Sequence, residues 1–96
     1  MDLKRLVATR RADILRTCTA HGAGNVALFG SVARGDAHPG SDLDVLVDLE
    51  PGRNLLDHIA LKQDLEDLLG VSVDVVTRRG IHPLLRDAIL AEAVPI

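Results

Sequence analysis

Residues Val26 to Val47 decide the fold of this chain, and they read VALFGSVARGDAHPGSDLDVLV. An apolar run, Val26 to Phe29, stops at Gly30-Ser31, and a short polar segment rich in glycine follows it. A second apolar run then begins with two carboxylates, Asp42 and Asp44. Short apolar runs bounded by glycine, proline and small polar residues are typical of buried strands. The stretch therefore predicts two strands joined by a turn, with acidic residues at the start of the second strand.

The length and composition predict a single domain, residues 1–96, with an aliphatic core. The chain has 96 residues, of which 47% are hydrophobic, but Phe29 is its one aromatic residue. A chain of this size has room for one hydrophobic core. Because that core must be built from leucine, valine, isoleucine and alanine, we expect helices packed on a small sheet.

The charge balance and the single cysteine restrict the partners and the compartment. Eleven Lys and Arg against fourteen Asp and Glu give a net charge of -3, which disfavours free nucleic acid as a partner. Cys18 is the one cysteine, so an internal disulfide is impossible and a reducing compartment is expected. The sequence shows neither an apolar signal segment near the N-terminus nor an apolar run long enough for a membrane span. These features predict a cytoplasmic protein without a membrane partner.

The remaining elements follow from periodicity and punctuation. We expect helices at about residues 2–20 and from Leu55 to a stop at Gly70, and a last helix that begins near Pro83. Strands are expected at residues 25–29, 42–49 and 71–77, with one helical turn at residues 31–35. The predicted fold class is α/β (α+β): a small mixed three-stranded sheet with helices packed on it. The apolar face predicted for the last helix consists of Leu84, Leu85, Ala88, Ile89 and Ala93, and an apolar tail, residues 94–96, follows it.

The first helix has a basic face whose role the sequence leaves open. Its apolar stripe includes Cys18, and its other side carries Lys4, Arg5, Arg10, Arg11 and Arg16. Such a face is either a solvated surface or a contact for a phosphate or an acidic partner.

Three aspartates point to a cation site. Side chains two residues apart in a strand lie on the same face, so Asp42 and Asp44 point the same way. Asp74 lies between Val73 and Val75 and therefore faces away from the side that those valines bury. If the third strand lies beside the second, the three carboxylates converge, and their mutual repulsion calls for a divalent cation. Carboxylate oxygens without a nearby histidine or cysteine favour Mg²⁺ or Mn²⁺ over zinc.

The glycine-serine bend predicts a phosphate site next to those carboxylates. Glycine lets backbone N–H groups approach a phosphate closely, and the Ser31 hydroxyl can donate to the same oxygens. Arg34, and also Arg78 or Arg79, are expected within reach of the remaining phosphate charge. The segment is not a Walker A motif, because Asp36-Ala37 stands where lysine and serine or threonine are required. The reaction that suits these groups is metal-assisted in-line attack on a phosphorus atom of a nucleoside triphosphate.

These residues resemble the nucleotidyltransferase superfamily that includes DNA polymerase β. The superfamily signature is Gly-Ser, about ten residues, Asp-x-Asp and a later Asp on another strand; here it is matched by Gly30-Ser31, Asp42, Asp44 and Asp74. The chain is most similar to minimal nucleotidyltransferase (MNT) domains, whose core reads G-S-x-A-R-G, a short loop and S-D-x-D-[LV]-x-V. Residues 30–35 and 41–47 match this core throughout.

The resemblance implies an antitoxin that acts on a HEPN-domain ribonuclease toxin within a hetero-oligomer. It implies transfer of AMP from ATP to a tyrosine hydroxyl of that partner, with two Mg²⁺ ions as cofactors. Asp42 and Asp44 would hold both metal ions, while Asp74 would join the ion that activates the acceptor hydroxyl and could serve as its base. Gly30 and Ser31 would bind the triphosphate.

Two residues and the mode of action stay open at this stage. Arg34 and Ser41 join the nucleotide-binding set as hypotheses, and Ser41 is explained equally well as a residue that stabilises the turn before Asp42. One alternative function is an antitoxin that neutralises its partner by binding alone. Another is a transferase that acts on a small molecule or an RNA end.

Overall fold

A four-stranded mixed sheet organises the fold in this computed structural model, which describes residues 2–96. The strands are β1 (Ala23–Phe29), β2 (Leu43–Leu49), β3 (Val73–Thr77) and β4 (Val94–Pro95), and they lie in the order β3-β2-β1-β4. β1 pairs antiparallel with β2 and with β4, whereas β2 and β3 are parallel. The predicted mixed sheet with packed helices is confirmed, although it has a fourth strand that was not predicted.

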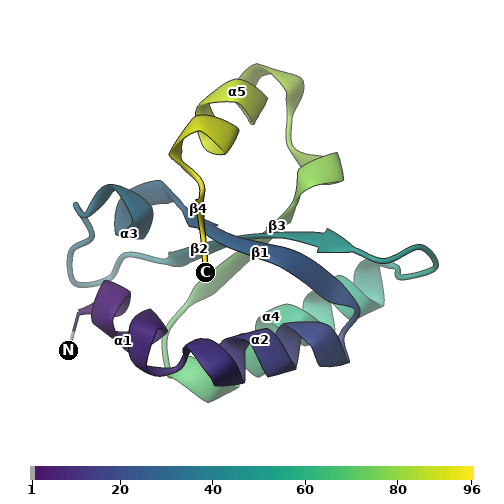
Figure 1. Cartoon of the computed structure of the whole chain (residues 1–96), viewed down its shortest axis with the longest axis horizontal. Helices are drawn as coiled ribbons and strands as arrows, with labels where there is room; N and C mark the ends of the chain where they lie inside the picture. Colours follow the sequence, from purple (N-terminus) through teal and green to yellow (C-terminus); the bar gives the residue numbers. More distant parts are fainter. Residues whose placement is uncertain (1) are drawn as a thin grey trace.

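The helices divide between the two faces of the sheet (Figure 1). α1 (Leu3–Thr9), α2 (Arg11–Ala20) and α4 (Leu55–Leu69) cover one face. The short α3 (Gly30–Arg34) follows β1 directly, and α5 (Pro83–Glu92) stands over the opposite face after a 3-10 turn, η1 (Arg78–Gly80). Among residues 2–96, the search for a helix of the length and hydrophobicity that a bilayer crossing needs finds none.

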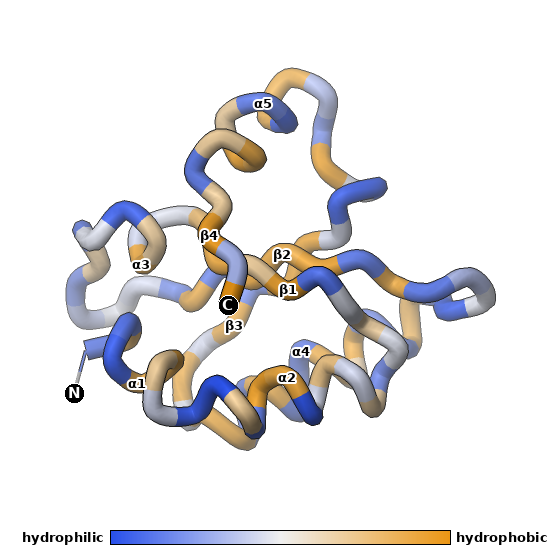
Figure 2. Tube along the Cα trace, in the orientation of Figure 1, coloured by the Kyte–Doolittle hydropathy of each residue, from blue (hydrophilic) through white to orange (hydrophobic). Residues whose placement is uncertain are grey.

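Alternation along the strands builds two hydrophobic clusters, one on each face of the sheet. Leu43, Val45 and Val47 of β2 join the main core under α2 and α4. Leu46, on the other side of the same strand, packs with Ala27, Phe29 and Ile81 in a smaller cluster under α5. In Figure 2 the middle parts of β1 and β2, which lie between the two clusters, are coloured as hydrophobic. The faces of β2 are thus those that the sequence alternation predicts.

Local capping fixes the ends of α4 where the sequence predicts them. The Asn54 side chain accepts the backbone N–H of Asp57 at 3.4 Å, and the Asp57 carboxylate accepts the Asn54 N–H at 2.9 Å. This reciprocal arrangement is a capping box. Gly70, with φ 70°, ends the helix in the left-handed conformation that glycine adopts without strain.

The single helix predicted for residues 2–20 is wrong, because the chain breaks at Arg10 into α1 and α2. Arg10 has φ -104° and ψ 17°, and its guanidinium bonds Asp13 at 3.0 Å. The break lets the two halves pack on different partners. α1 contacts α3, whereas α2 lies on β1 and α4.

The C-terminal prediction needs two corrections. Leu84 and Leu85 do not form a buried face of α5, because their exposed fractions are 87% and 55%. Only its C-terminal end, with Ile89 and then Ala93, packs on the smaller cluster. The apolar tail has a structural role, since it forms β4 and the Ile96 N–H donates to the Val26 carbonyl at 3.1 Å. Side-chain periodicity could not reveal this pairing, because it is made by backbone groups.

Strand boundaries differ from the predictions by one or two residues. β1 begins at Ala23 instead of residue 25, and an irregularity in its pairing with β2 falls between Gly24 and Ala27. Asn25 has φ 52° at that irregularity, and the continuously buried part of β1, Val26 to Phe29, begins directly after it. β3 begins at Val73, and Asp42 lies just before β2.

Candidate active site

Two carboxylates of the candidate site lie opposite each other on neighbouring strands. The parallel register pairs Asp44 of β2 with Asp74 of β3. Their neighbours Leu43, Val45 and Val73 are buried in the main core, so the aspartates face the other side of the sheet. Asp42 is exposed just ahead of β2, two residues before Asp44. The structure therefore brings the three predicted carboxylates to one end of one face.

The electrostatics confirm that these carboxylates act on one another. Burial, followed by the charges of Asp74 and Asp42, raises the pKa of Asp44 to about 6. The positive charge of Arg34 acts in the opposite direction on the same group. Like charges close together disfavour ionisation, and a bound cation would relieve this repulsion.

Gly30 brings the backbone against the acidic residues. It has φ 72°, a conformation that favours glycine, and a Cβ at this position would overlap the Asp44 carboxylate. Glycine is therefore required here both by the backbone conformation and by the close approach of β2. The Gly30 N–H donates to Glu92 Oε1 at 2.9 Å, which places the end of α5 at the same position.

The other predicted nucleotide-binding residues lie around this bend. Ser31 is partly buried in the first turn of α3, directly after Gly30. Arg34, at the end of α3, donates through Nη1 to Glu92 Oε2 at 3.0 Å and through Nε to Asp36 Oδ2 at 3.3 Å. The structure thus brings Gly30, Ser31 and Arg34 to the acidic end of the sheet.

Ser41 has a structural role in the loop before β2. Its hydroxyl oxygen accepts the His38 N–H at 2.9 Å, and its own N–H donates to the His38 carbonyl at 2.9 Å. These two bonds close the turn that leads into Asp42. This geometry favours the turn-stabilising interpretation of Ser41 over a role as a nucleotide ligand.

Glu92 is a residue of this site that the sequence reasoning missed. It is the last residue of α5, and its carboxylate bonds both Gly30 and Arg34. Its negative charge also contributes to the raised pKa of Asp44. A single glutamate outside every motif, 62 residues from Gly30, gives no sequence signal of this contact.

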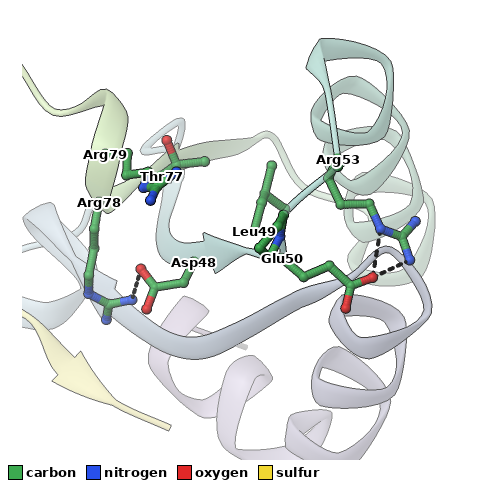
Figure 3. Close-up of a pocket in the computed structure, with 9 residues that line it drawn as sticks. Asp48, Leu49, Glu50, Arg53, Thr77, Arg78 and Arg79 are labelled. Carbon is green, nitrogen blue, oxygen red and sulfur yellow. Dashed lines mark hydrogen bonds and ion pairs between the residues drawn. The ribbon is translucent and has the colours of Figure 1, made fainter.

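Arg78 and Arg79 do not reach the candidate site, contrary to the prediction. They follow β3, at the opposite end of the strands, and line a hollow of about 350 Å³ with residues 48–53 (Figure 3). There Arg78 Nη1 pairs with Asp48 Oδ1 at 3.2 Å. Asp48 lies four residues after Asp44 in β2, a separation of roughly 13 Å along an extended strand. The error arose because the direction of β3 relative to β2 determines at which end of the sheet these arginines lie, and the sequence does not give that direction.

The donor groups at the acidic end suit a hard divalent cation. They are carboxylate oxygens on one face of the sheet, and burial together with their like charges raises the pKa of Asp44. As the side chains lie, no three His, Cys, Asp or Glu residues within 2–96 form a group that could hold a metal ion. The fit therefore concerns the type of the donors and the face of the sheet on which they lie, and the metal site stays a prediction.

An α/β fold with paired carboxylates facing a glycine-serine bend is the arrangement expected of a nucleotidyltransferase. The family model described as "Nucleotidyltransferase domain" matches residues 13–96, and the chain belongs to this family. It is thus a nucleotidyltransferase, as the motif predicts.

Sequence relatives agree with this assignment. A protein of Methanocaldococcus jannaschii, provisionally named a protein adenylyltransferase, is 49% identical over 86 residues, 90% of this chain and 92% of its own. The protein adenylyltransferase MntA of Thermococcus cleftensis is 40% identical over 76% of this chain and 74% of its own.

Solved structures show the same fold. A structure provisionally described as a minimal nucleotidyltransferase shares 56% identity, with a TM-score of 0.86, and the match covers 100% of this chain and 97% of that one. The resemblance to minimal nucleotidyltransferases is therefore confirmed.

Two toxin-antitoxin complexes also share the fold. One, with AMP-PNP, matches 88% of this chain and 69% of its own at a TM-score of 0.76 and 23% identity. The other, tri-AMPylated Shewanella oneidensis HEPN toxin with an MNT antitoxin, matches 97% and 71% at a TM-score of 0.68 and 20% identity. At these identities the likeness concerns the fold alone.

Proposed function

We propose that this protein transfers AMP from ATP to a tyrosine hydroxyl of a HEPN-domain toxin and thereby acts as its antitoxin. The observation that carries the proposal is the pairing of Asp44 with Asp74 beside the glycine-serine bend. This arrangement puts carboxylates next to groups that can hold a triphosphate. The relatives named protein adenylyltransferase supply the acceptor class, a protein.

The proposed chemistry is an in-line displacement at the α-phosphorus of ATP. The acceptor hydroxyl oxygen forms a bond to that phosphorus while the bond to the bridging oxygen breaks and pyrophosphate leaves. Asp74, exposed at the rim of the site, takes the hydroxyl proton. Gly30, Ser31 and Arg34 hold and orient the triphosphate through donors that surround its oxygens.

Mg²⁺ is the proposed metal cofactor, with Asp42, Asp44 and Asp74 as its ligands. Bound there, it would offset the carboxylate charge and stabilise the attacking and leaving oxygens. Burial and the charges of Asp74 and Asp42 together raise the pKa of Asp44, and this excess of negative charge supports a cation at this position. Carboxylate donors favour magnesium over softer metals.

A HEPN toxin is proposed as the partner because of the complexes that share this fold. The MNT antitoxin in one of them accompanies an AMPylated HEPN toxin. In this chain the described elements form one sheet with its packed helices, and the carboxylates are exposed or partly exposed at its surface. An acceptor residue on a second protein can therefore reach them.

The experiment that tests this function is a transfer assay with a candidate HEPN partner. The protein is incubated with Mg²⁺, ATP labelled on the α-phosphate and the HEPN protein encoded beside its own gene. We expect label on the partner and, by peptide mass spectrometry, on a tyrosine. Omission of Mg²⁺ should prevent labelling, and label from γ-labelled ATP in place of α-labelled ATP would contradict AMP transfer.

A second function, neutralisation by binding alone, competes with the first. It would leave the partner unmodified but inactive in a stable complex. The presence of Gly30, Ser31, Asp42, Asp44 and Asp74 together favours catalysis, since binding alone requires none of them.

A further inference from the structure

Glu92 is bound by two of the groups that the proposed function assigns to the triphosphate. Its Oε1 accepts the Gly30 N–H at 2.9 Å, and its Oε2 accepts Arg34 Nη1 at 3.0 Å. The two oxygens of one carboxylate thus bridge a backbone donor and a guanidinium. A phosphate group is recognised by the same pair of donors, since it also presents negatively charged oxygens.

Glu92 and a triphosphate cannot use these donors at the same time. The Gly30 N–H offers a single proton, and it already points at the Glu92 carboxylate. The site also contains the carboxylate of Asp44, beside Gly30. A triphosphate next to an ionised Glu92 would add further like charge to this small volume.

Most of α5, the helix that carries Glu92, is weakly attached to the sheet. No residue of α5 is buried, although the helix is described over its whole length. Its exposed side chains include Leu84, at 87%, and in Figure 1 the helix stands apart from the layer of α1, α2 and α4. Few buried apolar contacts mean a low free energy for local opening. The first turns of α5 can therefore move, whereas its C-terminal end is held by the packing of Ile89 and Ala93 and by the pairing of β4 with β1.

We propose that Glu92 is the internal occupant of the triphosphate position, and that a nucleoside triphosphate binds Gly30 and Arg34 by displacing the Glu92 carboxylate, which loosens α5. The inference rests on the proposed function and adds a residue outside every motif to its nucleotide site. Glu92 lowers nucleotide affinity, because each binding event must first break its two hydrogen bonds.

The decisive variant is Glu92→Gln, which keeps the size of the side chain and removes its charge. Its control is Asp87→Asn, which removes one negative charge from an exposed position of the same helix. We expect the Kd of AMP-PNP, measured by calorimetry with Mg²⁺, to fall about tenfold in Glu92→Gln, since a charge-assisted competitor is weakened. Asp87→Asn should bind as the wild type does.

Inorganic tripolyphosphate is the second probe, because it contains the phosphates without the nucleoside. Tripolyphosphate should bind Glu92→Gln more tightly than the wild type by the same factor as AMP-PNP does. This result would show that Glu92 competes with the phosphates and not with the nucleoside. Unchanged or weaker binding of both probes by Glu92→Gln would overturn the inference. Weaker binding in particular would mean that Glu92 positions the Gly30 N–H for the nucleotide.

Hydrogen exchange of the wild-type protein tests the displacement without any substitution. We expect AMP-PNP to accelerate amide exchange in residues 83–92, and slower exchange there would contradict the proposal. Failure of this inference is distinguishable from failure of the proposed function. If the wild type binds AMP-PNP and labels its partner while Glu92→Gln gains no affinity, only the inference fails. If no variant binds nucleotide, both fail.

Discussion

Asp44 of β2 and Asp74 of β3 lie directly opposite each other in a parallel pair of strands, with their side chains on the face away from the main core. Two ionised carboxylates at facing positions of neighbouring strands repel each other, and this repulsion destabilises the sheet. We therefore expect this arrangement to reduce the stability of the metal-free protein, and the proposed cation would offset that loss.

The stability of the metal-free protein should depend on the protonation of Asp44. Its pKa is about 6 in the folded protein against 3.8 for an ordinary aspartate, so the folded state binds the proton more tightly. The Asp44 contribution to the free energy of unfolding is thus fully present below pH about 4 and is lost as the pH rises through about 6. After allowance for solvent screening, we expect a loss of about 1 to 2 kcal/mol.

Urea unfolding in the presence of a chelator, repeated from pH 4 to 7, measures this loss. The quantity to compare is the difference between the wild type and Asp44→Asn, because other acids act in the opposite direction. Asp13, Asp48, Asp57 and Glu66 have lowered pKa values. At pH 7 Asp44→Asn should be the more stable protein, and a lower melting temperature for it would refute the crowding of these carboxylates.

Asp44→Asn should abolish AMP transfer and leave partner binding largely intact. The substitution removes a proposed metal ligand without changing the size of the side chain, and a loss of at least about 10²-fold in rate is expected for a group that stabilises the transition state. Labelling measures transfer, and size-exclusion chromatography measures the complex. Equal neutralisation of the toxin by this variant would favour binding alone as the mechanism.

Gly30→Ala should destabilise the protein by about 2 kcal/mol and prevent nucleotide binding. Alanine at this position would have to adopt a left-handed backbone conformation, and its methyl group would overlap the Asp44 carboxylate. Gly24→Ala is the matched control, since a Cβ there meets nothing within 4 Å and its φ is not positive. Thermal unfolding should separate the two variants, and equal melting temperatures would contradict the close approach at Gly30.

Arg34→Met and Arg78→Met should differ in nucleotide affinity. Arg34 lies beside Asp44 and the bend, so its loss should weaken AMP-PNP binding at least about tenfold. Arg78 is paired with Asp48 at the other end of the sheet, and its loss should leave the Kd unchanged. Calorimetry on both variants decides this, and a comparable loss in Arg78→Met would show that nucleotide contacts extend along β3.

Most of the helix and strand pattern was predictable because local rules fix it, although the break at Arg10 and β4 were not predicted. Asn54 and Gly70 bound α4 through capping and a left-handed residue, which act within one turn of the helix. The alternation of Leu43 and Val45 with Asp44 assigned the two faces of β2 before any fold was known. The Gly-Ser and Asp-x-Asp motifs likewise marked the site, since they lie within 15 consecutive residues, 30–44.

The tertiary structure alone decided which distant residues join that site. The parallel pairing of β2 and β3 places Asp74 opposite Asp44, and it places Arg78 beside Asp48 at the other end of these strands. The packing of α5 and the backbone pairing of β4 brought Glu92 to Gly30 across 62 positions of the chain. Periodicity reports the face on which a side chain lies, because neighbours along the chain determine it. It cannot report which remote segment covers that face, because this depends on backbone pairing and packing that involve the whole chain.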